Sequence, residues 1–380
     1  MRVLLVTHYY SEHGGGIEVV AGELGRQLAQ RGVVTLWAAS DLPTIPRRSS
    51  LPMRTWNIAE RVVGFAFPLW SPASLTRLWF EVEKCDLVHI HEGFYPGSLF
   101  ACVFARALGK PVVVTQHVGQ IPYHTGMPFS LRVTRWLLGF AHRSLGRIVL
   151  GTCARCVFIS PEVRDQFTQL FRFRREPRYI PNGVDQRVFH PVSRDERLRL
   201  RAKLGWPTDK PVLLFVGRFI DRKGLPLLRR LAGIFHECEW VFVGGGPADP
   251  GSWGLPNVRC PGRVGHPALG AYYQAADLLL LPSVIEGFPL VVQEAMASGT
   301  PVLVTREIVR GCPAVGDVAH VCDPTEEQFS LRLRELVASA SVLEDQRGAV
   351  ASFARKQWDW EECADRYLEL FADVLGSYPR

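Results

Sequence analysis

The chain has 380 residues, which exceeds the size at which one hydrophobic core usually stops growing, so we expect two domains. Hydrophobic residues make up 47% and charged residues 21%, ordinary values for a globular protein, which exclude a disordered or low-complexity chain. Residues 1–190 hold 22 of the 44 Lys and Arg but only 13 of the 37 Asp and Glu, so this half favours an anionic partner or surface. A nucleic acid is not expected, because no zinc-finger or RNA-recognition signature accompanies the charge.

The N-terminus and the cysteines indicate a cytoplasmic protein. Residues 1–6 form an apolar run that suits a first strand and is too short for a signal peptide, and no stretch of 18 apolar residues predicts a membrane span. Nine cysteines without a disulfide framework suit a reducing compartment. Cys153 and Cys156 have the spacing of a redox or metal pair, but no second pair accompanies them, so we expect buried strand thiols.

The first 40 residues predict a strand, a glycine loop, a helix and a second strand. Gly14-Gly15-Gly16 follows the apolar start, and Val20, Leu24 and Leu28 then recur at helical spacing. A glycine run after a first strand permits close approach of the backbone to a phosphate or a sugar. The run lacks both a Walker A lysine and G-x-G-x-x-G spacing, which argues against a dinucleotide oxidoreductase.

Two further strands, at residues 87–91 and 112–115, are each followed or ended by histidine. His91 ends the first, and His117 comes two residues after the second. Each histidine alone is as consistent with buried structure as with a site. Because both reach the carboxyl edge of one sheet, where open α/β sheets bind ligands, a site there is favoured.

A basic amphipathic stretch runs from Met127 to Leu150. Arg132, Arg135 and Arg143 alternate there with apolar residues. Such a helix fits either an anionic membrane surface or a core-packed position with a solvated arginine face. Peripheral contact with the inner face of the membrane is therefore a hypothesis.

The second half begins after a turn-rich hinge at residues 180–185. An apolar strand at residues 211–216 leads into Arg218 and Lys223, two cations five residues apart on a strand-to-helix loop. Two isolated surface cations would not indicate a site. On a strand-to-helix loop, however, they are able to hold a diphosphate, with Arg218 as a planar fork of donors and Lys223 as a point charge.

The stretch Pro282–Thr305 carries the strongest signal. Buried strands are predicted on both sides of it, and one short helix lies between Pro289, suited to the first helical position, and Gly299, suited to the residue after the end. The helix therefore begins at the carboxyl end of the preceding strand, where free amides and the helix dipole favour an anion. Glu286 and Glu294 lie eight residues apart beside this place, which suits an anion that also carries hydroxyl groups, such as a sugar nucleotide.

Four motifs resemble those of the retaining glycosyltransferases of family four. They are G-G-x-E at Gly15, N-G-V-D at Asn182, G-R-x-x-x-x-K-G at Gly217 and E-G-F-P-L-V-x-x-E-A-M-A-x-G-T-P-V at Glu286. The resemblance implies the GT-B architecture, an α/β fold of two Rossmann-like domains facing across a cleft. Residues 1–185 with 358–380 would bind the acceptor, residues 186–357 would bind the nucleotide sugar, and the C-terminal helix would cross back onto the first domain.

The resemblance also assigns roles to single residues. Arg218 and Lys223 would hold the diphosphate, Glu294 the ribose, and Glu286 and His117 would border the donor sugar; of these, Glu286, His117, Arg218 and Lys223 are the expected catalytic residues. The other expected donor-binding residues are Gly15, Gly16, Val264, Phe288, Leu290 and Val291.

The implied activity is a retaining hexosyl transfer from a UDP- or GDP-sugar to a glycan or lipid-linked acceptor, in polysaccharide or cell-envelope glycan synthesis. The departing phosphate oxygen would deprotonate the acceptor, and fixed cations and amides would stabilise the diphosphate. No Asp-x-Asp occurs in the sequence, so neither a metal nor a cofactor is expected. Two alternatives are a nucleotide-sugar-binding subunit without turnover and a sugar-nucleotide epimerase of the same fold; the intact charged set argues against both.

Overall fold

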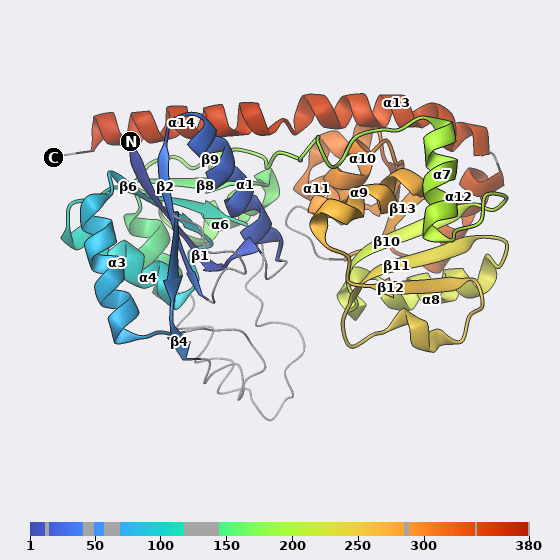
Figure 1. Cartoon of the computed structure of the whole chain (residues 1–380), viewed down its shortest axis with the longest axis horizontal. Helices are drawn as coiled ribbons and strands as arrows, with labels where there is room; N and C mark the ends of the chain where they lie inside the picture. The colour runs from blue at the N-terminus through green and yellow to red at the C-terminus, as the bar shows by residue number, and fades with distance from the viewer. Residues whose placement is uncertain are drawn as a thin grey trace. The chain divides into compact units, whose positions relative to one another are not determined.

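The computed structural model describes residues 1–11, 15–40, 49–56, 69–117, 144–284, 289–338 and 340–378. The chain divides into two compact units, Met1–Asn182 with Trp360–Arg380, and Gly183–Asp359. The first unit ends at Asn182 where the sequence suggested 185, and it resumes at Trp360 where the sequence suggested 358. Each unit is an α/β structure built on a parallel sheet (Figure 1).

The sheet of the first unit has seven parallel strands in the order β3-β2-β1-β6-β7-β8-β9. Strands β2 and β3 lie on one side of β1, and the strands from β6 onward lie on its other side. The strand order therefore reverses between β1 and β6, and open α/β sheets bind ligands at such a switch point. The strands are β1 (Arg2–Tyr9), β2 (Val34–Ser40), β3 (Ser50–Met53), β6 (Leu87–His91), β7 (Val112–Gln116), β8 (Arg155–Phe158) and β9 (Arg178–Tyr179), with a separate antiparallel pair β4 (Thr55–Trp56) and β5 (Leu69–Trp70).

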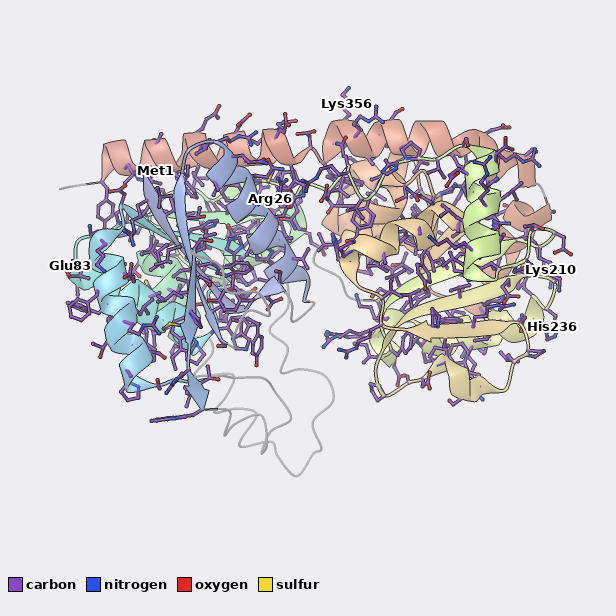
Figure 2. The ribbon with its side chains drawn as sticks, in the orientation of Figure 1. Met1, Arg26, Glu83, Lys210, His236 and Lys356 are labelled. Atoms are coloured by element: carbon purple, nitrogen blue, oxygen red, sulfur yellow. The ribbon has the colours of Figure 1, made fainter. Side chains whose placement is uncertain are left out.

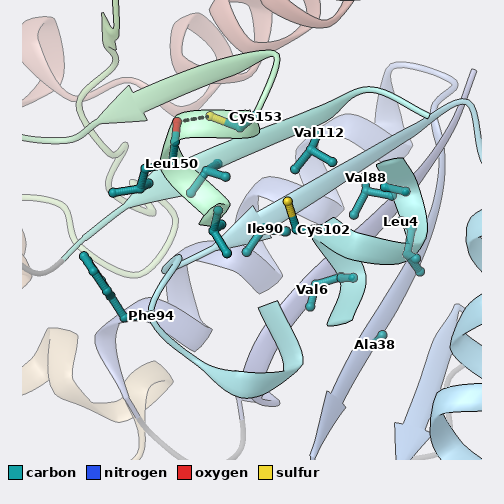
Figure 3. Close-up of a cluster of buried hydrophobic side chains, with 14 of the residues drawn as sticks. Leu4, Val6, Ala38, Val88, Ile90, Phe94, Cys102, Val112, Leu150 and Cys153 are labelled. Atoms are coloured by element: carbon teal, nitrogen blue, oxygen red, sulfur yellow. Dashed lines mark hydrogen bonds between the residues drawn. The ribbon is translucent and has the colours of Figure 1, made fainter. Parts of the chain in front are cut away.

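Helices cover this sheet with apolar stripes. Ser71 and Ser160 cap two of them by accepting a hydrogen bond from a first-turn amide, and a proline follows each cap. Figure 3 shows Val88, Ile90 and Val112 of the sheet gathered with Cys102 and Leu150 of the covering helices. The helices are α1 (Gly16–Gln30), α3 (Pro72–Lys84), α4 (Pro96–Ala107), residues 144–152, α6 (Pro161–Leu170) and α14 (Trp360–Ser377).

The C-terminal helix α14 completes the first unit, as the sequence predicted. It buries a stripe at helical spacing that includes Tyr367 and Phe371, and it lies beside α1 (Figure 1). Ion pairs hold its outer side, Arg31 to Asp365 at 2.6 Å and Arg155 to Asp373 at 2.6 Å.

The sheet of the second unit has six parallel strands in the order β12-β11-β10-β13-β14-β15. Its switch point lies between β10 and β13, the two strands whose exits carry the predicted cations and the Pro282–Thr305 stretch. The strands are β10 (Val212–Arg218), β11 (Glu239–Gly245), β12 (Val258–Gly262), β13 (Leu278–Leu281), β14 (Val302–Thr305) and β15 (His320–Cys322).

The second unit contains ten described helices, and three of their details differ from what the sequence predicts. They are α7 (Arg194–Leu204), α8 (Leu225–Ile234), α9 (His266–Ala275), α10 (Leu290–Ala297), α11 (Arg306–Gly311), α12 (Glu326–Ala338) and α13 (Ala340–Gln357), with short 3-10 helices η4 (Asp221–Lys223), η5 (Pro250–Trp253) and η6 (Pro313–Asp317). Charged side chains such as Lys356 on α13 and Glu83 on α3 point outward (Figure 2).

Two of these differences bear on the site. The sequence predicts a helix from Ala271 to Asp277, but helix α9 begins five residues earlier, at His266, because Pro267 suits its first turn. Pro289 is the N-cap of α10 and not its first helical residue, since its ψ of 110° is extended. Gly299 follows the C-cap with φ of +77°, as predicted for the residue that ends the helix.

The third difference concerns the acid-rich segment before the C-terminal helix. The sequence predicts one helix that ends near Gly348, whereas the structure has two, α12 and α13, and α13 continues to Gln357. The thiols of Cys153 and Cys156 are both buried, but only Cys156 lies in a strand. Within the described ranges, no helix is both long and apolar enough to cross a bilayer.

Candidate functional site

The exit of β10 places the two predicted cations on one short loop. Arg218 is the last residue of the strand and is exposed, while Lys223 ends η4 and is half-buried. Gly224 follows with φ of +83°, and any side chain there would overlap Pro282 at the exit of β13. Glycine therefore allows the cation loop to approach the neighbouring strand's exit directly.

Hydrogen bonds join these two loops. Val284 N and Ser283 Oγ both donate to the carbonyl of Arg222, at 3.2 Å each. Thr305 Oγ1, at the end of β14, donates to the Ser283 carbonyl at 2.6 Å. The exits of three adjacent strands are thus held together at the switch point. Glu286 and Phe288 lie outside the described residues.

Glu294 lies in α10, buried, with 6% of its surface exposed. Tyr273 OH donates to its Oε2 at 2.8 Å, and His266 Nε2 lies 3.3 Å from its Oε1. Burial, and then the charge of Glu294, raise the pKa of Tyr273 well above its usual range, so this hydroxyl remains a donor. A carboxylate has about four acceptor positions, so Glu294 retains capacity for further hydroxyl donors.

The remaining predicted donor-binding residues of this unit border the same helix ends. Leu290 and Val291 are the first two residues of α10, where backbone amides and the helix dipole favour an anion. Val264 is half-buried between β12 and α9, just before His266. The rings of Phe189 and His266 pack edge to face, with centroids 5.0 Å apart, and this contact restricts the imidazole position.

In the first unit, the glycine loop ends at the N-terminus of α1. Gly15 is the N-cap and Gly16 the first helical residue. Glu18 is buried and folds back, so that a side chain on Gly15 would overlap its carboxylate. Burial raises the pKa of Glu18. An incoming phosphate would therefore meet this carboxyl group at the helix end, an arrangement that motif spacing did not predict.

The two histidines at the carboxyl edge of the first sheet contact each other. His91 Nδ1 and His117 Nε2 are 3.0 Å apart, and the rings stack with centroids 5.2 Å apart. Burial lowers the pKa of His117 to about 3 and that of His91 well below its usual value. Both imidazoles are therefore neutral near pH 7 and act as hydrogen-bonding groups, not as cations.

A hydroxyl chain continues behind this pair. His89 Nε2 hydrogen-bonds Thr115 Oγ1 at 2.8 Å, and Thr115 Oγ1 in turn lies 2.9 Å from Tyr367 OH on α14. Considering only the parts of the chain that are described, His89 Nδ1 and His91 Nε2 have no hydrogen-bond partner. The histidine edge is thus supported by the C-terminal helix.

Glu92, directly after His91, has the strained backbone expected at a site. It is the only non-glycine residue with positive φ, at 73°, within the described ranges, and it is buried. Its amide donates to the Thr115 carbonyl at 2.8 Å, its carbonyl accepts from Ser98 Oγ at 2.7 Å, and its carboxylate accepts from Gln116. Such conformations cost about 1–3 kcal/mol and persist where surrounding contacts fix them. Sequence reasoning missed Glu92, although a charged residue after a buried strand was a usable signal.

Comparisons with known proteins agree with this arrangement. The profile described as Glycosyltransferase Family 4 matches residues 14–188, and that of Glycosyl transferases group 1 matches residues 210–339. Phosphatidyl-myo-inositol mannosyltransferase of Mycobacterium tuberculosis (strain ATCC 25618 / H37Rv) is 26% identical, covering 99% of this chain and 98% of its own length. D-inositol 3-phosphate glycosyltransferase 1 of Catenulispora acidiphila is 28% identical, covering 95% and 91%.

Solved structures are similar over the whole chain. Sucrose-phosphate synthase from Thermosynechococcus elongatus superposes with a TM-score of 0.77 at 20% identity, covering 99% of this chain and 100% of that one. Anabaena Alr3699/HepE in complex with UDP-glucose gives 0.75 at 17% identity, covering 98% and 100%. The fold is therefore GT-B, and the protein is a glycosyltransferase. The two matched profiles span both units, and the chain belongs to family 4 of the glycosyltransferases, group 1.

Proposed function

We propose that the protein transfers a hexose from a nucleotide sugar to a glycan or lipid-linked acceptor, with retention of anomeric configuration and without a metal ion. One observation carries the proposal. At the switch point of the second sheet, the Arg218 and Lys223 loop is hydrogen-bonded to the exit of β13, and the next helix buries Glu294. Cations, a helix N-terminus and a carboxylate at one edge suit a ligand that carries both phosphate and hydroxyl groups.

The donor diphosphate is assigned to the cations. Arg218 offers a planar fork of donors and Lys223 a compact charge, while the first amides of α10 add neutral donors. Glu294, oriented by Tyr273, accepts from the ribose hydroxyls. Glu286 and Phe288 follow the exit of β13. The motif alone assigns Glu286 to the donor sugar and Phe288 to donor binding. Val264 is assigned to the base through its backbone.

The first unit is assigned to the acceptor and to one side of the donor sugar. His117 is neutral and hydrogen-bonded to His91, which suits contact with uncharged sugar hydroxyls. Gly15 and Gly16 lie at the same edge, after β1, where the carboxyl group of Glu18 folds back over Gly15 and suits a hydroxyl group of a ligand.

The chemical step follows from this assignment. As the bond to the anomeric carbon breaks, negative charge grows on the diphosphate, and the prepositioned cations and amides stabilise it without reorganising. The departing phosphate oxygen takes the proton of the acceptor hydroxyl, which attacks the same face of the sugar. The stabilisation is supplied by Arg218, Lys223 and the amides, and the sequence offers no Asp-x-Asp to bridge the phosphates through a metal.

The acceptor class is proposed from charge and from relatives. The names of two relatives specify mannosyl transfer to phosphatidyl-myo-inositol and glycosyl transfer to inositol 3-phosphate. The basic surplus of residues 1–190 suits an acceptor of that phosphate-bearing kind. We place the enzyme in the cytoplasm, with peripheral contact to the inner membrane face through its basic first half; of the Met127–Leu150 stretch, only residues 144–150 are described.

Calorimetric titration with UDP, GDP, ADP and their sugar conjugates, with and without EDTA, tests the proposal. Saturable and EDTA-insensitive binding of one nucleoside diphosphate is expected. The matching nucleotide sugar should then be hydrolysed or transferred with the α or β configuration of the donor preserved, as read by NMR. Binding of none of them, or binding abolished by EDTA, would refute the proposed donor site.

A further inference from the structure

We propose that a basic pocket at the amino edge of the first sheet binds the phosphate group of a second anionic ligand. The pocket has a volume of about 320 Å³ and lies around the turn between α4 and β7. Among the described residues, its lining contains three cations and two hydroxyl groups and no carboxylate; these five polar residues are Arg106, Lys110, Arg174, Thr152 and Tyr378.

The charge of the pocket is not neutralised by the described part of the protein. Arg106 and Arg174 are both exposed, and neither forms an ion pair with any described residue. Arg155, by contrast, is paired with Asp373 a short way along the same unit. Cations that converge on a cavity without a counter-charge repel one another, and a bound anion relieves that repulsion.

The lining is held in place by the fold. Lys110 Nζ donates to the Cys85 carbonyl at 2.8 Å, which fixes the ammonium and leaves two of its three donors for a ligand. Gly109, with φ of +65°, makes the tight turn that directs Lys110 into the pocket. Arg175 Nη1 donates to Ser377 Oγ at 2.6 Å and fixes the end of α14 next to Tyr378. The pocket is thus assembled from several elements and is not a single run of basic residues.

This pocket is separate from the histidine edge. It contacts Val112, the first residue of β7, whereas His117 follows the last residue of the same strand. A five-residue parallel strand is roughly 17 Å long, so the two places lie at opposite edges of the sheet. The pocket therefore belongs to neither the donor nor the acceptor site proposed above.

The chemistry of the ligand is a phosphate group, and its source is either a soluble molecule or a lipid headgroup. The pocket volume exceeds one water-sized site many times over, which suits a phosphorylated polyol or a diphosphate. Two exposed apolar side chains adjoin it in sequence, Val103 one turn before Arg106 and Ile148 one turn before Thr152, each 46% exposed. They would enter the acyl boundary if the phosphate belonged to a membrane lipid.

The test compares two variants with the same change in net charge. The pocket variant is Arg106→Glu/Arg174→Glu, and the control is Arg172→Glu/Arg178→Glu, two exposed residues of the same unit that do not line the pocket. Both are made in a Lys223→Ala background, which weakens binding at the proposed donor site. The soluble probes are inorganic pyrophosphate and glycerol 3-phosphate, titrated by calorimetry. The membrane probes are phosphatidylcholine vesicles with and without phosphatidylglycerol, assayed by sedimentation.

The parent is expected to bind one class of probe, and the pocket variant to bind it at least about ten-fold more weakly, as expected for loss of charge-assisted hydrogen bonds. The control should stay within about two-fold of the parent. Binding of pyrophosphate or glycerol 3-phosphate identifies a soluble ligand; binding only of phosphatidylglycerol vesicles identifies a headgroup. No binding of any probe, or an equal loss in the control, overturns the proposal. Nucleotide binding by the pocket variant with Lys223 intact reports separately on the donor site.

Discussion

The carboxyl edges of the two sheets differ in electrostatic character although the sheets are built alike. The second unit places Arg218 exposed and Lys223 half-buried on a loop, and buries the carboxylate of Glu294 behind them. At the corresponding edge, the first unit buries neutral imidazoles and hydroxyl groups together with the carboxyl group of Glu92, which accepts a hydrogen bond from Gln116. The same parallel-sheet architecture therefore presents cations on a strand exit in the second unit and buried imidazoles in the first, because different residues stand at the strand ends.

Of the changes considered, removal of Arg218 and Lys223 should have the largest effect on ligand binding. In Arg218→Ala/Lys223→Ala, the affinity for the preferred nucleoside diphosphate is expected to fall at least about 100-fold, since each charge-assisted contact contributes about 1.5–3 kcal/mol. Calorimetry measures this directly. Arg222→Ala, which removes one neighbouring positive charge, is the control, because its side chain is exposed and lies between the two in sequence while its carbonyl accepts the structural hydrogen bonds. An equal loss in the control would mean that general positive charge, not these two residues, binds the ligand.

Tyr273→Phe tests how the buried carboxylate of Glu294 is oriented. The change removes the donor to Glu294 Oε2 but keeps the ring, so a buried acceptor loses a partner at a cost of about 1–3 kcal/mol. We expect a lower unfolding temperature and about ten-fold weaker nucleotide binding. Tyr272→Phe, on the same helix and packed against Trp206, should change neither quantity appreciably. Normal nucleotide affinity in Tyr273→Phe would show that Glu294 is oriented without this hydroxyl.

Tyr367→Phe tests the histidine edge of the first unit, and its expected effect is smaller. Thr115 loses a hydroxyl partner and His89 loses the fixed end of its hydrogen-bond chain, so a fall in kcat of roughly two- to five-fold is expected with the donor KM unchanged. Steady-state kinetics separates the two constants. Tyr272→Phe, in the second unit and packed against Trp206, is the control. A change in KM alone would contradict a positioning role for this chain of hydroxyls.

The buried imidazoles also predict how stability depends on pH. Burial lowers the pKa of His89 and His117 to about 3, whereas an unfolded histidine has a pKa of about 6.5. The unfolded state therefore binds more protons between these values, and stability falls as the pH drops below about 6.5, by up to about 1.4 kcal/mol per pH unit for each ring.

His89→Gln should accordingly reduce that slope by about one proton, measured by urea unfolding between about pH 7.5 and 5.5 with hydrogen exchange at β6 and β7 as the local probe. His236→Gln, at an exposed position that points outward (Figure 2), should leave the slope unchanged. A slope that is the same in His89→Gln and in the parent would mean that His89 contributes no such proton uptake.

Local signals made much of this molecule predictable from sequence. The apolar runs of β13 and β14 and the glycine that ends α10 all lie within one short stretch, so the strand–helix–strand unit followed from neighbouring residues. The positions of Arg218 and Lys223 on a strand exit followed in the same way. The family motif added the expected roles, which the mutations above are designed to test.

Contacts between distant residues were not predictable. Tyr273 and Glu294 are 21 residues apart and meet only because α9 packs beside α10, and helical spacing alone marks Tyr273 as an ordinary core residue. Thr115 and Tyr367 are 252 residues apart. The start of α9 was predicted too late because His266-Pro267 was not recognised as a helix beginning, and with it the contact of His266 to Glu294 was missed.

The return of the chain to the first unit has a consequence for synthesis. Residues 1–182 leave the ribosome long before α14, and domains generally begin to fold as they emerge. The apolar stripe of α14, with Tyr367 and Phe371, is then absent. The surface beside α1 therefore remains uncovered, and the Thr115 hydroxyl remains without Tyr367, until the whole second unit has been translated. Assembly of the histidine edge is therefore among the last folding events of the chain, and a nascent protein halted before residue 360 carries the motifs of both units but an unfinished first one.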